Sequence, residues 1–221
     1  MATILIAGCD SLPGRPTQAE LPLRPSNVTD FATLYGENCA GCHGADGKSG
    51  AAIAMNNPIY LAIIDDASMR HVISDGVPGT AMPPFAQSAG GSLTDHQIDL
   101  LIAGIRKDWS ALPDAASGAP PYSNSGAGDP NTGGQVYATN CQSCHGPDGK
   151  GGPAGSIVDG AYLSLVSNQY LRTIVIAGRP DLGHPDWKHD ASGQPLTATQ
   201  VSDVVAWLAS KRPASPLAQS N

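Results

Sequence analysis

The chain contains an internal repeat whose two copies are related by an offset of 102 residues as far as Pro83 and Pro185, and of 103 residues from Leu93 and Leu196 onward. The offset appears when the halves are aligned on two Cys-x-x-Cys-His segments, residues 39–43 and 141–145. Identical residues then stand at Tyr35/Tyr137, Asn38/Asn140, Cys39/Cys141, Cys42/Cys144, His43/His145, Gly44/Gly146, Asp46/Asp148, Gly47/Gly149 and Lys48/Lys150. Self-similarity at a fixed period indicates two copies of one structural unit. The chain is therefore predicted to fold as two domains of the same kind.

The repeat also predicts where the domains begin and end. We expect a first unit at residues 28–110 and a second unit at residues 132–213. Between them, residues 111–131 are rich in Gly, Pro and Ser, which is typical of a linker. Residues 1–27 are expected to be a shortened signal segment followed by a Pro-rich tether, and residues 214–221 a C-terminal tail.

Each Cys-x-x-Cys-His segment predicts covalent attachment of a c-type haem. The two thiols form thioethers with the porphyrin, and the histidine that follows directly binds the iron. The proximal iron ligands are therefore expected to be His43 and His145. The cysteines assigned to haem attachment are Cys39, Cys42, Cys141 and Cys144. A redox dithiol or a zinc site is disfavoured, because a zinc site would need a second Cys or His pair in the same unit.

The sixth iron ligand of the first unit is expected to be Met82. It lies in the segment Gly-Thr-Ala-Met-Pro-Pro, 39 residues after His43. Pro83 disfavours helical geometry at Met82, so this segment is predicted to be an extended loop that crosses the haem face. Met69 and Met55 are weaker candidates, because Met69 falls in a predicted helix and Met55 in the variable loop after the motif.

The second unit departs from the first at this position. With the offset unchanged, His184 takes the place of Met82 and is again followed by proline. No methionine occurs after Met82 in the sequence. We therefore expect His184 to be the distal ligand of the second haem, with His189 as the alternative. His71 and His96 are interpreted as surface residues.

The remainder of each unit is predicted to be helical. Apolar residues recur at i, i+3, i+4 and i+7 in 98–105 and in 201–208, and each run follows a Thr-x-x-Gln capping box. Further helices are expected at 29–39, 68–74, 132–141 and 168–177. No stretch alternates in the manner of a strand, so the predicted fold class is all-α.

Composition and charge restrict the partners and the core. The formal net charge is −7 and the pI is near 5.1, which argues against nucleic acid as a partner because clustered Lys and Arg would be needed. Aromatic residues make up only 5% of the chain, while Gly and Pro together number 45. A buried apolar cofactor in each unit would therefore compensate for scarce apolar side chains.

The fifth cysteine, Cys9, ends an Ile-Ala-Gly-Cys segment that resembles a bacterial lipoprotein box. The preceding residues lack Lys and Arg and are fewer than in a normal export signal. We expect lipid to be attached to Cys9, with the Pro-rich tether leading away from the membrane. The alternative is an unmodified cysteine in the N-terminal tail. Further along, no apolar run approaches about 18 residues, so no transmembrane helix is predicted.

With these residues in place, each unit resembles a class I cytochrome c domain. The shared features are an N-terminal helix, Cys-x-x-Cys-His, a distal ligand loop and a final amphipathic helix, over about residues 28–109 and 132–212. The resemblance implies two tandem helical domains, each folded around a covalently bound haem c. The usual distal ligand of the family is methionine, which Met82 matches and from which His184 departs.

Two further expectations come from the resemblance. An aromatic residue of the last helix commonly packs against the haem-bearing helix, and Trp207 fits this role. Its counterpart Gly104 has no side chain, so the first unit is expected to be looser there. In some relatives a proline carbonyl holds the proximal histidine; Pro153 matches that position in the second unit, whereas the first unit has Ala51.

The resemblance implies an electron carrier, or an electron-transfer subunit of a larger complex, in place of an enzyme. A haem with both axial positions occupied by protein is left with outer-sphere electron transfer. Thioether attachment normally follows export, which predicts the periplasmic side of a bacterial membrane. The expected partners are redox proteins of a respiratory complex that links quinol oxidation to a terminal oxidase or another acceptor.

Three alternative functions remain open from the sequence. The chain could be the electron-accepting subunit of a periplasmic dehydrogenase. A dihaem peroxidase would need one open iron face and a nearby acid or base. A haem-based gas sensor would need His184 to be displaced by its ligand.

Overall fold

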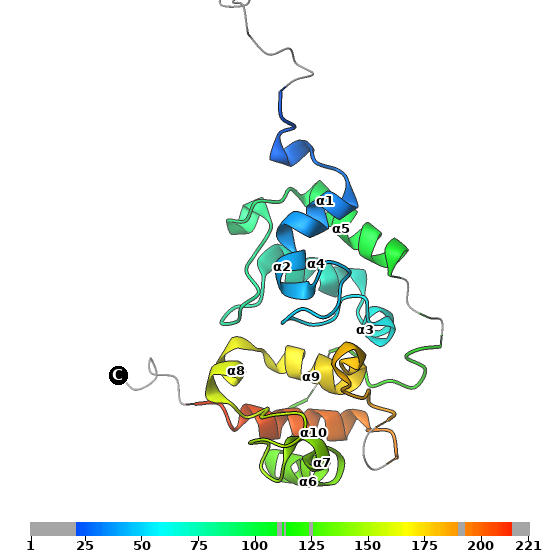
Figure 1. The fold of residues 1–221 in the computed structure, drawn as a ribbon, viewed down its shortest axis with the longest axis vertical. Coiled ribbons are helices and arrows are strands. Elements are labelled where there is room, and N and C mark those ends of the chain that lie inside the picture. The colour runs from blue at the N-terminus through cyan, green and yellow to red at the C-terminus, as the bar shows by residue number, and fades with distance from the viewer. Residues whose placement is uncertain (1–20, 110–111, 113, 124–125, 190–192, 214–221) are drawn as a thin grey trace, which may run out of the picture.

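The computed structural model describes residues 21–109, 112, 114–123, 126–189 and 193–213. Within these residues the chain consists of helices and loops and contains no β-strand; two isolated bridges join Ala86 to Leu93 and Arg179 to His184. The predicted all-α class is therefore confirmed. The two units lie one above the other, with the first at the top of Figure 1.

Both units contain the same succession of helices, as the repeat predicts. The first unit holds α1 (Phe31–Asn38), α2 (Ala40–His43), α3 (Pro58–Ile63), α4 (Asp66–Asp75) and α5 (Asp95–Asp108). The second unit holds α6 (Pro130–Asn140), α7 (Gln142–His145), α8 (Gly160–Leu165), α9 (Asn168–Ala177) and α10 (Ala198–Ala209). Short 3₁₀ turns occur at η2 (Pro25–Asn27), η3 (Gln87–Ala89) and η4 (Pro180–Leu182).

The final helix of each unit begins and packs as its sequence pattern predicts. Both capping boxes are formed, by Thr94 with Gln97 and by Thr197 with Gln200. Such a box satisfies backbone N–H groups that the first turn of a helix leaves unpaired. The apolar stripes are buried in the cores, with Ile98, Leu101 and Ile105 in α5 and Val201 and Val204 in α10.

The short helices α3 and α8 do not appear in the sequence prediction. Each has six residues and begins at a side-chain cap, Asn57 for α3 and Asp159 for α8. Six residues span fewer than two turns. Their apolar residues therefore give no recognisable periodicity.

The first unit is not looser at Gly104, so that expectation is wrong. The ring of Phe31 fills the space beside Gly104, where an added Cβ would collide with it. Trp109, just after α5, packs edge-on against Tyr35 with ring centroids 4.9 Å apart. It also covers Gly47, in the loop after the first motif. Trp109 thus supplies the aromatic contact that Gly104 lacks.

The second unit solves the same packing problem in the opposite way. Gly133 stands at the position of Phe31, and Trp207 stands at the position of Gly104. The Trp207 ring stacks on Tyr137 with centroids 4.2 Å apart, and a Cβ on Gly133 would press against the Trp207 side chain and the α10 backbone. The aromatic residue at this contact therefore lies on the first helix, α1, in the first unit and on the last helix, α10, in the second.

The two units are in direct contact through α3 and α9. Side chains of both units contribute to one buried apolar cluster, which includes Tyr60 from α3 and Ile176 from α9. The described part of the linker is bound to the second unit, because Arg172 donates hydrogen bonds from Nε and Nη2 to the carbonyl oxygen of Pro121 at 3.0 and 2.8 Å. Among the described residues, no helix is long and apolar enough to cross a membrane.

Candidate haem-binding sites

Each Cys-x-x-Cys-His motif forms a single helical turn that brings its three functional side chains together. In the first unit Cys39 ends α1 and begins α2, and the His43 backbone N–H donates to the Cys39 carbonyl at 3.0 Å. The second unit repeats this with Cys141 and His145, also at 3.0 Å. Residues at i, i+3 and i+4 lie on one face of a helix. Both motifs are therefore arranged for two-point attachment and ligation of one group.

No disulfide joins the motif cysteines. Cys39 and Cys141 are half-buried, and Cys42 and Cys144 are exposed. Burial raises the pKa of Cys39 to about 11, so this thiol stays protonated at neutral pH. The two histidines are each only 8% exposed. A buried histidine beside one half-buried and one exposed thiol is the arrangement expected for a haem that is attached to the protein along one edge.

Both proximal histidines are oriented by a backbone carbonyl. The Nδ1 atom of His43 lies 2.9 Å from the Ile53 oxygen, and that of His145 lies 3.2 Å from the Gly155 oxygen. A carbonyl accepts only, so Nδ1 carries the proton and Nε2 is left as the ligating atom. Burial lowers the pKa of His43, and the nearby charge of Arg179 lowers it further. The neutral imidazole that iron requires is thus favoured.

The carbonyls that hold the histidines are not those expected from Pro153 and Ala51. They belong to the residues two positions later in each unit. The loop after each motif folds back through a hydrogen bond from the Ala52 N–H to Cys42, and from the Ala154 N–H to Cys144, at 2.9 and 3.0 Å. This turn brings the carbonyls of Ile53 and Gly155, one residue further along, to the Nδ1 atoms of His43 and His145. The prediction from the resemblance was therefore wrong by two residues.

A tyrosine also recurs at each site and was missed as a site residue. The Tyr35 hydroxyl donates to the Gly44 carbonyl at 2.8 Å, and the Tyr137 hydroxyl donates to Gly146 at 2.5 Å. Each bond ties the helix before the motif to the residue after its histidine. Burial raises the pKa of Tyr35, which keeps it a donor. The repeat contains both tyrosines, so the offset could have identified them.

The distal loops of the two units share one backbone geometry. The Val77 N–H donates to Met82 at 2.9 Å, and the Arg179 N–H donates to His184 at 3.1 Å. Gly76 and Gly178 precede these loops with φ of 66° and 67°, in the left-handed region. A Cβ on either would collide with the backbone beside its candidate ligand. Met82 and His184 therefore occupy equivalent positions, as the offset predicts.

In the second unit the two candidate ligands face one another. The imidazole centroids of His145 and His184 lie 5.9 Å apart, with an interplanar angle of 43°. Two metal–nitrogen bonds of about 2 Å each, as imidazole makes to first-row metals such as zinc, account for most of that separation. The Nδ1 atom of His184 is buried and has no hydrogen-bond partner in the described residues. Burial lowers the pKa of His184, followed by the effect of His145. These residues fit an iron held between two imidazoles.

The competing candidates lie elsewhere. Met55 and Met69 are 6% and 1% exposed and belong to the apolar core. His189 is exposed, with Nδ1 2.9 Å from Asp186. His71 and His96, which the sequence analysis interprets as surface residues, are exposed. Cys9 lies outside the described residues.

Comparison with known proteins gives a match in both units. The model of the family described as cytochrome c oxidase, cbb3-type, subunit III, matches residues 26–103 and 128–208. A cbb3-type oxidase subunit FixP of Sinorhizobium medicae (strain WSM419) is 31% identical over 135 residues, which cover 56% of this chain and 40% of the relative. A subunit CcoP of Azospirillum sp. (strain B510) is 29% identical over 136 residues, covering 57% and 41%. The chain spans about 40% of the length of these curated relatives.

Among solved structures, the reducing HAO-like protein complex of Kuenenia stuttgartiensis matches 87% of this chain and 100% of its own, with 16% identity and a TM-score of 0.48. The family match is more informative, because it covers most of the chain and falls on each repeated unit separately. The chain therefore belongs to the cbb3-type cytochrome c oxidase subunit III family, and it is a dihaem c-type cytochrome that carries two covalently bound haem c groups.

Proposed function

We propose that this protein transfers single electrons between redox partners on the periplasmic side of a bacterial membrane. The observation that carries the proposal is the pair of imidazoles of His145 and His184, which face each other at 5.9 Å. The equivalent loop of the first unit has the same backbone hydrogen bond, from the Val77 N–H to the Met82 carbonyl at 2.9 Å, which supports Met82 as the corresponding ligand. Haem c supplies reversible one-electron chemistry, and a protein ligand on both sides of the iron leaves no open position for a substrate.

The proposed ligands divide the two sites by type. We assign His43 and Met82 to the first site and His145 and His184 to the second. The cysteines proposed for attachment are Cys39, Cys42, Cys141 and Cys144. A methionine ligand raises the reduction potential of a c-type site relative to a second histidine, which donates electrons more strongly. We therefore propose that electrons enter at the second unit and leave from the first.

A redox titration of the haem-loaded protein tests this order. Two midpoints are expected, with the lower one at the site whose spectrum lacks the methionine–iron band in the near infrared. Equal midpoints, or a higher midpoint at the second unit, would contradict the proposed direction.

The proposed partner is a membrane-bound respiratory complex of the cbb3-oxidase type, since the relatives are named as subunits of that oxidase. Charge supports docking through the first unit: residues 28–110 contain four Lys and Arg against nine Asp and Glu, whereas the counts in residues 132–213 are equal. An acidic surface favours a basic partner and speeds association at low ionic strength. Electron delivery from the reduced protein to a purified oxidase core should therefore slow as salt is added. An acceptor that is reduced equally fast at all salt concentrations would not be this partner.

We also propose that lipid on Cys9 holds the protein at the membrane. Mass spectrometry of the protein purified from its host, with Cys9→Ala as the control, tests this directly. A lipid adduct on the natural sequence, absent from C9A, is expected. An unmodified Cys9 would overturn the proposal.

The rival enzyme and sensor functions make opposite predictions. A peroxidase would turn over hydrogen peroxide, and a gas sensor would shift its reduced spectrum with carbon monoxide. The fully ligated electron carrier is expected to do neither in the absence of denaturant. The alternative carrier role, as a subunit of a periplasmic dehydrogenase, would be indicated by faster reduction from such an enzyme than from a quinol-oxidising complex.

A further inference from the structure

Arg179 and Asp181 form a buried ion pair at the boundary between the units. The guanidinium donates from Nε and Nη2 to the two carboxylate oxygens at 3.0 and 2.7 Å, and both side chains are 6% exposed. At the offset of 102 residues these positions correspond to Val77 and Gly79 in the first unit. The pair is therefore an addition to the repeated fold.

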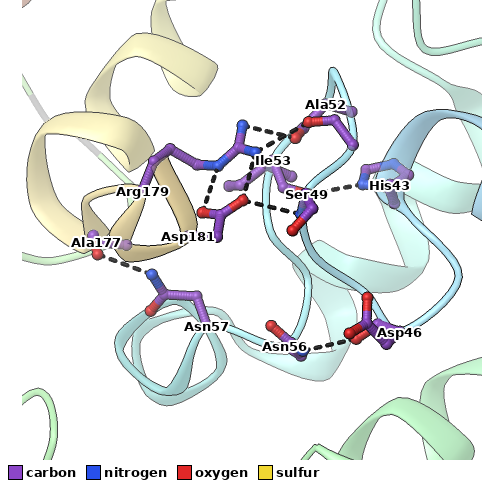
Figure 2. A network of polar contacts seen from close by, with 11 residues as sticks. His43, Asp46, Ser49, Ala52, Ile53, Asn56, Asn57, Ala177, Arg179 and Asp181 are labelled. Carbon is purple, nitrogen blue, oxygen red and sulfur yellow. Dashed lines mark hydrogen bonds and ion pairs between the residues drawn. The ribbon is translucent and has the colours of Figure 1, made fainter. Parts of the chain in front are cut away.

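Additional partners of this pair come from the first unit (Figure 2). Arg179 donates from Nη1 to the Ala52 carbonyl and from Nη2 to the Gly50 carbonyl, both at 2.9 Å. The Ser49 N–H donates to Asp181 Oδ2, also at 2.9 Å. We call these five residues the inter-unit clasp. Buried charges are costly unless fully paired, and here every guanidinium nitrogen and both carboxylate oxygens have a partner.

On the side of the first unit, the clasp fixes the loop that orients the proximal histidine. Ala52 directly precedes Ile53, whose carbonyl lies 2.9 Å from Nδ1 of His43. Figure 2 shows Arg179 reaching this loop, with His43 beside it. Displacement of Ala52 would therefore move the group that sets the orientation of the His43 ring.

The same loop contains a strained residue. Ser49 has φ of 62°, and it is the only non-glycine residue with positive φ in the described part of the chain. Its counterpart in the second unit is Gly151, which adopts positive φ at little cost. Strain of this kind persists where surrounding contacts impose it, and the bond from the Ser49 N–H to Asp181 is such a contact.

On the side of the second unit, the clasp belongs to the distal loop. The Arg179 N–H donates to the His184 carbonyl at 3.1 Å, and the His184 N–H donates to the Arg179 carbonyl at 3.0 Å. The backbone of Arg179 thus anchors the candidate distal ligand of the second site, while its side chain anchors the proximal loop of the first.

We propose that Arg179, oriented by Asp181, is a positioning residue for both haem sites: it holds loop 49–53 of the first unit against loop 179–184 of the second, so that the two sites keep one separation. Electrons then pass between the units over a fixed distance. The inference rests on the proposed two-site electron transfer, and its experiments distinguish failure of the clasp from failure of that function.

The first experiment is amide hydrogen exchange on the full-length, haem-loaded protein. Arg179→Gln removes the guanidinium that binds both Asp181 and the first unit. Arg212→Gln is the matched control, because Arg212 binds the carbonyls of Leu163 and Val166 inside the second unit at 3.0 and 2.9 Å. Exchange in residues 49–53 is expected to rise about tenfold or more in R179Q alone. Unchanged exchange there, or an equal rise in R212Q, would overturn the proposed clasp.

The second experiment follows electron exchange within the molecule after flash photoreduction. The natural protein should show a first-order phase whose rate does not depend on protein concentration. R179Q should slow this phase about tenfold or more, because rates fall steeply when reacting groups are displaced. Arg179→Lys should also be slow, since a lysine ammonium cannot replace the planar fork.

The outcomes separate the two proposals. A rate that is unchanged while exchange in residues 49–53 rises would overturn the positioning role but leave two-site electron transfer intact. A natural protein without any intramolecular phase would overturn both. Both sites should remain low-spin in R179Q, and the low-spin spectrum of the first site should shift because the His43 ring loses its fixed orientation. Loss of either low-spin spectrum would reassign Arg179 to structural support of that site.

Discussion

Replacement of Gln97 by methionine should destabilise the protein more than the same change at Gln200, although both residues close a capping box. The Gln97 side chain is 2% exposed. Its Oε1 accepts from the Thr94 N–H at 3.0 Å, and its Nε2 donates to the carbonyls of Pro25 and Val28 at 2.8 and 3.0 Å. Gln97 therefore joins α5 to the chain that enters α1 and leads to the first motif.

The expected loss follows from these three bonds. Loss of the reciprocal cap costs about 1 kcal/mol. A buried acceptor left unpaired costs about 1–3 kcal/mol, and the lower end applies here because Pro25 is exposed and its oxygen still accepts from the Val28 N–H. Only the Val28 carbonyl is left unpaired, so the sum for Gln97→Met is about 2 kcal/mol. Methionine has a similar volume, so little of this loss comes from packing.

The control has the same cap without the additional bonds. Gln200 accepts from the Thr197 N–H at 2.9 Å, and no hydrogen bond from its amide nitrogen occurs within the described residues. Gln200→Met should cost only about 1 kcal/mol. Urea unfolding of both haem-loaded variants, followed by far-ultraviolet circular dichroism, measures the difference. Equal losses in the two variants would refute the reasoning that Gln97 fixes the entry into α1.

Three further predictions concern the second unit and the clasp. His184→Met should raise the midpoint potential of the second site toward that of the first, because methionine favours the reduced iron; an unchanged potential would exclude His184 as a ligand. Trp207→Ala should cost about 3 kcal/mol in urea unfolding, since its ring stacks on Tyr137 at 4.2 Å, and a loss below about 1 kcal/mol would contradict this packing role. Hydrogen bonds from Arg179 hold the pKa of Asp181 below its ordinary value of 3.8, so its stabilisation is present above that pH and is lost as pH falls through the lower folded pKa. Thermal unfolding between neutral pH and pH 3 should show a larger loss in the natural protein than in Asp181→Asn, because the other carboxylates with lowered pKa values titrate in both proteins.

The repeat predicted the fold class and the equivalence of the distal loops because both depend on local sequence. The capping boxes and the apolar stripes of α5 and α10 were likewise predicted and are observed. The offset of 102 residues aligned His184 with Met82, and the two loops have the same backbone hydrogen bond at these positions. Short-range signals of this kind are complete within one turn or one loop of the chain.

The errors arose where a position was judged without its neighbour in space. Gly104 indicated a loose contact only because the sequence does not show that Phe31 fills the space beside it or that Trp109 packs against Phe31 and Tyr35. The carbonyl over His43 belongs to Ile53, since the direction of a loop that folds back on its helix is set by hydrogen bonds and not by residue type.

The inter-unit clasp was not predicted, although the two copies of the repeat differ at its charged residues. Arg179 and Asp181 replace Val77 and Gly79, and a charged pair at a position that is uncharged in the other copy indicates a contact outside the repeated fold. Their partners lie more than 120 residues away in the sequence, so only the packing of α3 against α9 identifies them. A comparison of the two copies for such differences would have selected both residues.

Low-temperature electron paramagnetic resonance of the oxidised, haem-loaded protein, combined with near-infrared absorption, tests the central claim most directly. The account predicts two low-spin signals, one from a histidine–methionine site with its methionine–iron band and one from a bis-histidine site. A substantial high-spin signal would show an open iron position, and would contradict the assignment of this protein as an electron carrier with two fully ligated sites.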